Sequence, residues 1–98
     1  MRPSRTEGAE SFMAIRFTKH ALEKFEVLRR HGVFITKAKV LMTVTNPEFV
    51  DRQSRAPLTV SQSTLDQRRV LRVVYRQEGQ NIVIITFYPG RKSQYAKE

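Results

Sequence analysis

The chain has 98 residues, no cysteine, and 18 lysines and arginines against nine acidic residues, so its formal net charge is +9. This length suffices for one domain with a modest hydrophobic core. The lack of cysteine excludes a disulfide framework and a thiolate metal site. The positive charge favours an anionic partner, either a nucleic acid or an acidic protein, over a basic surface that only keeps the protein soluble.

The chain is expected to divide into three parts. Residues 1–12 are polar and lack hydrophobic periodicity, which predicts a flexible N-terminal arm and no signal peptide. Residues 13–95 carry the patterned segments and are expected to form a single α+β domain, followed by a C-terminal tail at residues 96–98. Met13 is a candidate for the natural first residue. No apolar run reaches the roughly 18 residues of a membrane span, so we expect a cytoplasmic protein without a membrane partner.

Two helices are predicted after a short strand at residues 13–17, in which every second residue is apolar. Thr18 can cap the first helix, whose apolar residues recur at helical spacing until Gly32 ends it. The second helix is expected from the cap Thr36 to about Thr45, where an Asn-Pro pair stops it. Two consecutive helices with a short connection predict an αα-hairpin.

The second half of the chain reads as β-structure. We expect the order β-α-α-β-β-β-β, with the two helices packed on one face of a twisted antiparallel sheet. The other face is then open to solvent or to a ligand. The expected segments are a weak strand at residues 48–52, an edge strand at 58–63, a strand at 68–77, a hairpin turn at 78–81 and a last strand at 82–88.

The strand at residues 68–77 has two different faces. Its apolar face is expected in the core, whereas Arg68, Arg72 and Arg76 alternate with two valines on the other face. A row of arginines can contact phosphate groups or an acidic protein partner. The plainer alternative is a solvated strand face.

The last strand leads through Pro89-Gly90 to Arg91, Lys92 and Tyr95. We expect a turn at Pro89-Gly90 that presents these cationic and proton-donating side chains to a phosphate-bearing ligand. The alternatives are an ordinary polar turn for Arg91 and Lys92, and a cover for the sheet edge in the case of Tyr95.

His20 is the second residue of the first predicted helix, near unpaired N–H groups. The positive end of the helix dipole favours its neutral form and therefore a role as proton acceptor or base, with a structural histidine as the alternative. His31 lies about 16 Å further along the helix axis, too far away to share a metal ion. Because carboxylate pairs at a suitable spacing and glycine-rich phosphate loops are also missing, we expect no metal and no cofactor.

Short motifs follow one another in a fixed order between about residues 13 and 95. They are Thr-Lys-His-Ala at 18–21, His-Gly-Val at 31–33, Ile-Thr at 35–36, Asn-Pro at 46–47, and Ile-Thr-Phe-Tyr-Pro-Gly-Arg-Lys at 85–92 with Tyr95 beyond it. In this order the chain resembles a small bacterial family of unknown function in the RelE/ParE-like toxin superfamily. The resemblance implies the RelE/ParE-like fold. Members of the superfamily are toxin halves of toxin–antitoxin pairs; some cleave mRNA on the ribosome and others act on gyrase.

The resemblance also implies a chemistry and a partner. In RNA cleavage a 2′-hydroxyl attacks the neighbouring phosphate, so a site must remove a proton, stabilise charge and protonate the leaving oxygen. By resemblance, Arg91 would stabilise the phosphate and Tyr95 would transfer a proton or stack on a base. His20 completes the expected catalytic set of a metal-independent endoribonuclease, and an acidic antitoxin would be its protein partner.

A second function stays open beside the ribonuclease. The lysine pair that precedes the sheet in active ribosome-dependent members has no counterpart here. The alternative is a non-catalytic basic module that binds RNA or an acidic protein, with Arg68, Arg72, Arg76 and Lys92 as the expected contact residues.

Overall fold

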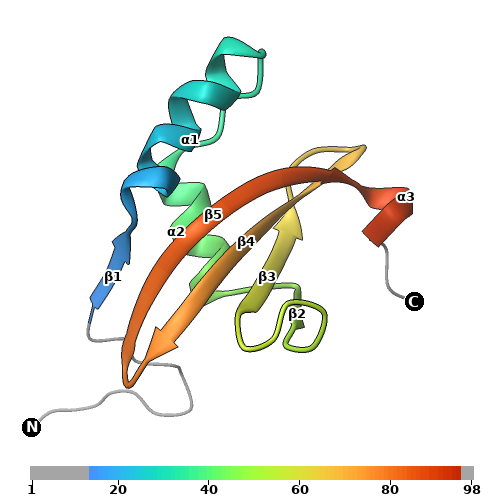
Figure 1. The fold of residues 1–98 in the computed structure, drawn as a ribbon. Helices are drawn as coiled ribbons and strands as arrows, with labels where there is room; N and C mark the ends of the chain where they lie inside the picture. Colours follow the sequence, from blue (N-terminus) through green and yellow to red (C-terminus); the bar gives the residue numbers. More distant parts are fainter. Residues whose placement is uncertain (1–13, 96–98) are drawn as a thin grey trace, which may run out of the picture.

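Three helices and one five-stranded sheet make up residues 14–95, the part of the chain that the computed structural model describes (Figure 1). The α+β class is confirmed. The expected arm at residues 1–12, Met13 and the tail at 96–98 lie outside the described residues. The elements are β1 (Ala14–Phe17), α1 (Lys19–Arg30), α2 (Lys37–Thr45), β2 (Phe49–Asp51), β3 (Thr59–Thr64), β4 (Arg69–Glu78), β5 (Asn81–Arg91) and α3 (Lys92–Tyr95).

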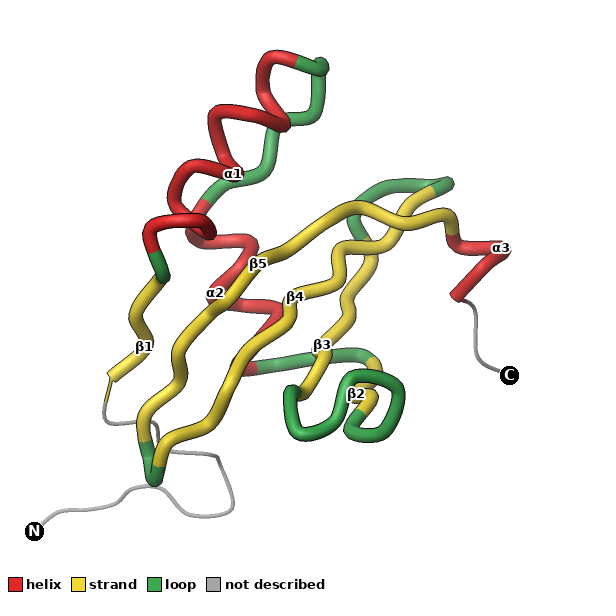
Figure 2. Tube along the Cα trace, in the orientation of Figure 1, coloured by secondary structure: helices red, strands yellow, loops and turns green. Residues whose placement is uncertain are grey.

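The sheet is mixed, with the strand order β1-β5-β4-β3-β2 (Figure 2). Strands β2 to β5 pair antiparallel, whereas β1 runs parallel to β5, so the prediction of a purely antiparallel sheet is wrong. A parallel pair needs a long connection, and here both long helices and three strands lie between the two partners. The strand predicted at residues 58–63 is present as β3, but its predicted place at the edge of the sheet is wrong. It lies inside the sheet, and the three-residue β2 forms the edge.

Both long helices begin and end where local sequence signals place them. The hydroxyl of Thr18 accepts a hydrogen bond from the Ala21 N–H at 3.1 Å, and that of Thr36 accepts one from the Lys39 N–H at the same distance. Each cap satisfies a backbone donor that a helix leaves unpaired in its first turn. Gly32 follows α1 with φ +82°, a conformation that costs glycine little.

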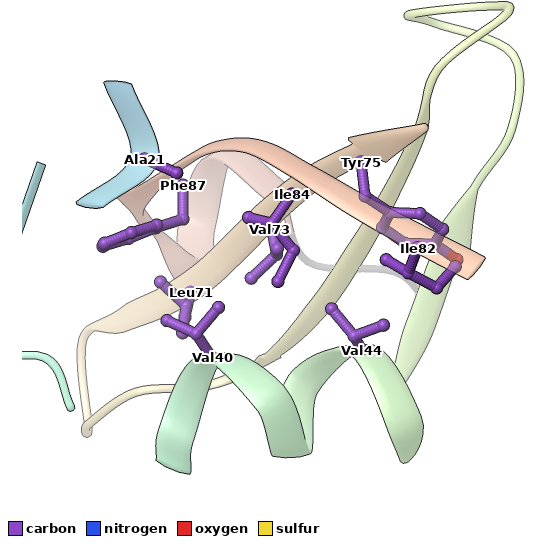
Figure 3. Packing of buried hydrophobic residues seen from close by; sticks show 9 residues of the cluster. All are labelled: Ala21, Val40, Val44, Leu71, Val73, Tyr75, Ile82, Ile84 and Phe87. Atoms are coloured by element: carbon purple, nitrogen blue, oxygen red, sulfur yellow. The ribbon is translucent and has the colours of Figure 1, made fainter. Parts of the chain in front are cut away.

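The hydrophobic core lies between these two helices and one face of the sheet. Helix α1 packs against β5 and β1, and α2 packs against β4 and β3. Figure 3 shows the side chains of both helices pointing at the apolar face of the two longest strands. The buried members of this cluster are Ala21, Val40, Val44, Leu71, Val73, Tyr75, Ile82, Ile84 and Phe87.

A bulge at Ile85 changes which residues of β5 face the core. Ile84 is opposite Tyr75 and Thr86 is opposite Val74, so Ile85 is an extra residue without a partner in the register. Alternation therefore shifts by one position, which puts Phe87 into the core and Tyr88 on the opposite face. Thr18, the cap residue of α1, fixes the backbone at the bulge, because its N–H donates to the Ile84 carbonyl and its hydroxyl donates to the Ile85 carbonyl.

The last strand is longer than predicted. Instead of turning at Pro89-Gly90, β5 continues to Arg91, where it is still paired with Arg69 of β4. Because β1 pairs with β5 only as far as Ile84, the strand has a single neighbour beyond that point, where a proline without an N–H is tolerated. The short helix α3, absent from the prediction, follows directly. None of the helices within residues 14–95 is long and apolar enough to cross a membrane.

Candidate anion-binding site

An open hollow of about 1010 Å³ lies where the turn between β3 and β4 meets the junction of β5 and α3. The Lys92 N–H donates to the Arg68 carbonyl at 2.9 Å, and Arg69 lies directly opposite Arg91 in the strand register. The antiparallel pairing of β4 and β5 thus brings the two segments together. We call this depression the basic hollow; its lining residues are Asp66, Gln67, Arg68, Arg69, Arg91, Lys92 and Ser93.

Asp66 organises the turn that forms one wall of the hollow. One of its carboxylate oxygens accepts hydrogen bonds from the backbone N–H groups of Arg68 and Arg69, at 2.9 and 2.8 Å. The other oxygen forms an ion pair with the Arg69 guanidinium, in which the Nη2 atom is 2.8 Å away. The Arg68 N–H and then the Arg69 side chain lower the pKa of Asp66, so the carboxylate stays charged and orders the turn.

Three cations of the hollow are left without an ion-pair partner. Among residues 14–95, Arg68, Arg91 and Lys92 take part in no salt bridge; a more distant attraction to Lys92 comes from Glu48. Two like charges also face each other across the strands at Arg69 and Arg91. Directly opposed like charges are destabilising. Asp66 offsets the charge of Arg69, whereas the charge of Arg91 has no ion-pair partner among the described residues and is available to an anion.

Arg72, expected on the open face of the sheet, is instead buried and only 5% exposed. Its Nε atom donates to the Tyr88 hydroxyl at 3.2 Å, its Nη1 atom donates to Gln62 Oε1 at 2.6 Å, and its Nη2 atom lies 3.6 Å from Asp51 Oδ2. The guanidinium carbon also lies 4.1 Å from the centre of the Tyr95 ring. Helix α3 therefore covers this part of the face that the sequence predicted to be open.

The three arginines of the predicted row end up in three different environments. Arg68 lies in the turn before β4 and lines the hollow, whereas Arg72 is buried under α3. Arg76 is exposed near the far end of β4 and forms an ion pair with Glu78 at 2.6 Å. They do not form one continuous surface.

The predicted catalytic residues are not gathered at one point. Arg91 lines the hollow, while Tyr95 does not line it and stacks on Arg72. His20 is exposed in the first turn of α1, whose cap residue Thr18 bonds to the Ile84 and Ile85 carbonyls at the bulge in the middle of β5. That bulge is seven residues before Lys92, or about 20 Å along a strand.

Sequence reasoning missed four residues that shape this end of the molecule. Arg69 and Asp66 belong to the hollow, and Asp51 and Gln62 hold the Arg72 guanidinium. The Asp-Gln-Arg-Arg segment does carry a turn signal, since an aspartate is favoured where its oxygens can accept the following N–H groups. Asp51 and Gln62 have no local signal, because their roles depend on strand pairing.

Within residues 14–95 no group of three or more histidine, aspartate or glutamate side chains is placed to hold a metal ion. No protein-family model, no curated protein and no solved structure matches the chain. Function therefore has to be argued from the basic hollow and its surroundings.

Proposed function

We propose that this chain is a toxin-like protein of the RelE/ParE superfamily that binds RNA at the basic hollow, through the phosphate backbone. The ordered motifs support the superfamily placement, as does the succession of one strand, two helices and four strands. The observation that carries the function is the convergence of Arg68, Arg91 and Lys92 on one open hollow, where none of the three has an ion-pair partner among residues 14–95.

Phosphate contact is the chemistry that fits these groups. Guanidinium and ammonium groups bind phosphate oxygens by charge-assisted hydrogen bonds, and their affinity for a polyanion depends strongly on salt. None of the described residues that line the hollow is aromatic, so the proposed contact does not depend on base stacking. The expected mode is therefore backbone binding with little sequence preference.

Binding without cleavage is favoured over catalysis by the position of the proton-transfer groups. A ribonuclease needs its base and acid within hydrogen-bond reach of the reacting atoms. His20 is about 20 Å from the hollow along β5, and the Tyr95 ring is engaged with Arg72. The experiment therefore also has to test whether the protein cleaves RNA, either alone or on ribosomes.

The test is a titration of a fluorescein-labelled single-stranded RNA, followed by anisotropy at several salt concentrations. The hollow variant replaces Arg68, Arg91 and Lys92 by alanine. We expect about a tenfold or greater loss of affinity at 0.1 M salt. The slope of log K against log salt should shrink by about 2, because each lost phosphate contact removes about 0.7 for a single strand.

A matched control removes the same charge elsewhere. Arg16, Lys19 and Lys24 lie on β1 and α1, away from the hollow, and form no ion pair within residues 14–95. Their triple alanine variant should lose less than about threefold in affinity, because only the long-range field changes. Equal losses in both variants would contradict a localised site. Polyglutamate that binds as tightly as RNA would contradict RNA in favour of an acidic protein, and cleaved RNA on a gel would contradict a non-catalytic role.

A further inference from the structure

We propose that Tyr95 is a positioning residue whose aromatic ring, held between Arg72 and Gly90, fastens α3 to the sheet and thereby places Lys92 beside Arg91 at the basic hollow. We call this arrangement the ring clamp. It deepens the proposed function, on which its RNA-binding consequence rests. The resemblance implied that Tyr95 transfers a proton or stacks on a base, whereas the geometry points to a contact of its ring inside the protein.

The first half of the clamp is the close approach of the Tyr95 ring to Gly90. A Cβ atom added to Gly90 would lie 2.7 Å from Tyr95 Cδ2 and closer still to Cε2. Real Cβ atoms do not come this near to a ring carbon, so a side chain at this position has to displace the tyrosine. Gly90 has no positive φ, and the need for glycine here is therefore one of space and not of backbone conformation.

The second half of the clamp is the buried guanidinium of Arg72 at 4.1 Å from the ring centre. A cation at this distance from an aromatic face is attracted by it, more strongly when water is excluded. Hydrogen bonds and an ion pair from three other strands hold the guanidinium in place, through Asp51 of β2, Gln62 of β3 and Tyr88 of β5. The ring thus rests on a fixed platform.

Gln62 ties the backbone of α3 to the same platform. Its Oε1 atom accepts from Arg72 at 2.6 Å, and its Nε2 atom donates to the Tyr95 carbonyl at 3.3 Å. Both contacts come from one side chain that is 7% exposed. The platform therefore holds Tyr95 at the ring and at the main chain.

Helix α3 depends on such contacts because it has only four residues. A helix this short is unstable by itself and takes its conformation from tertiary packing. Lys92 is its first residue and Arg91 directly precedes it. Release of Tyr95 would therefore free Lys92 and its N–H, which bonds to the Arg68 carbonyl across the hollow, whereas Arg91 stays paired with Arg69 in the sheet.

Three substitutions distinguish the role of the Tyr95 ring from that of its hydroxyl. Tyr95→Phe keeps the ring and the carbonyl, so it should bind RNA within about twofold of the wild type. Tyr95→Ala removes the ring, and Gly90→Ala displaces it. We expect both to weaken RNA binding about fivefold to tenfold, although every cation of the hollow is still present.

The rate of amide hydrogen exchange at Lys92, measured by NMR, reports in the absence of RNA whether α3 is held to the sheet. This exchange should be about tenfold faster in Tyr95→Ala and unchanged in Tyr95→Phe. Thermal melting by circular dichroism checks that each variant is folded, and Tyr95→Ala carries the test if Gly90→Ala does not fold.

The outcomes distinguish the two proposals. If the wild type binds RNA and Tyr95→Ala matches it in affinity and in Lys92 exchange, the clamp is refuted while the proposed function stands. If the wild type binds no RNA, the proposed function fails. The ring clamp is then judged by hydrogen exchange alone: faster Lys92 exchange in Tyr95→Ala supports it, and unchanged exchange overturns it. A loss of affinity in Tyr95→Phe equal to that in Tyr95→Ala assigns the role to the hydroxyl and overturns the inference.

Discussion

Replacing Arg72 by alanine is expected to lower the free energy of unfolding by about 3–5 kcal/mol, the usual cost of breaking a buried ion pair on one side. Arg72 is 5% exposed, and its removal leaves the Gln62 carbonyl and the Tyr88 hydroxyl without the donor that they now share. Hydrogen bonds to charged groups contribute about 1.5–3 kcal/mol each, and a desolvated cation–π contact about 2 kcal/mol. These contributions are not additive, so the range is set by the whole network.

Arg76 provides the matched control on the same strand. Its side chain is 46% exposed and pairs with Glu78, a surface ion pair that typically contributes less than about 1 kcal/mol. Arg76→Ala removes the same side chain from the same face of β4 and leaves no buried group unpaired. The difference between the two variants therefore isolates the buried network from the loss of charge.

Urea denaturation followed by far-UV circular dichroism measures this difference. A domain of this size has a stability of roughly 5–15 kcal/mol, so Arg72→Ala should still be folded in buffer unless the wild type lies at the lower end of that range. With a slope near 2 kcal/mol per molar urea, the midpoint should fall by about 2 M, against about 0.3 M or less for Arg76→Ala. Equal midpoints for the two variants would refute the stabilising role of the network and remove the platform of the ring clamp.

Two further predictions concern hydroxyl and carboxyl groups. Within the described residues the buried Ser61 hydroxyl has no hydrogen-bond partner, whereas the Ser63 hydroxyl shares a 2.6 Å hydrogen bond with Thr43. In thermal melts Ser61→Ala should therefore be neutral or more stable by about 1 kcal/mol, and Ser63→Ala less stable by about 1 kcal/mol. The opposite order of stability would contradict this prediction. The hydroxyl and N–H of Ser54 hold the pKa of Asp51 well below its ordinary value, with the Arg72 charge as a smaller cause. At acid pH the unfolded chain then binds more protons than the folded one, so the free energy of unfolding should fall as the pH drops from about 5 to 2. Asp51→Asn should flatten this pH dependence, and an equally steep profile in the variant would contradict the prediction.

Local sequence signals were sufficient for the two long helices. Thr18 and Thr36 cap them as predicted, and Gly32 follows the first one at positive φ, because a cap and the residues that it satisfies are neighbours in the chain. The position of strand β4, its apolar core face and the tight turn at Gly79 were equally readable, since alternation and turn chemistry are also local. The α+β class follows from these elements alone.

The candidate site was predictable only in part. The sequence singled out Arg68, Arg91 and Lys92 in separate segments, and the pairing of β4 with β5 brings these three to one hollow. Arg72 and Arg76 have the same residue type and the same spacing. Burial under α3 and the ion pair with Glu78 separate them from that group.

The sequence by itself determined the type and approximate limits of the two long helices and most strands, together with the basic charge of the residues that line the hollow. Only the tertiary structure decided that β1 lies parallel to β5, that Ile85 forms a bulge, and that α3 folds back over Arg72. The physical reason is the range of the interactions. Caps, turns and periodicity act between residues a few positions apart, whereas strand order and the burial of a charge depend on partners that are distant in the chain and meet only after folding.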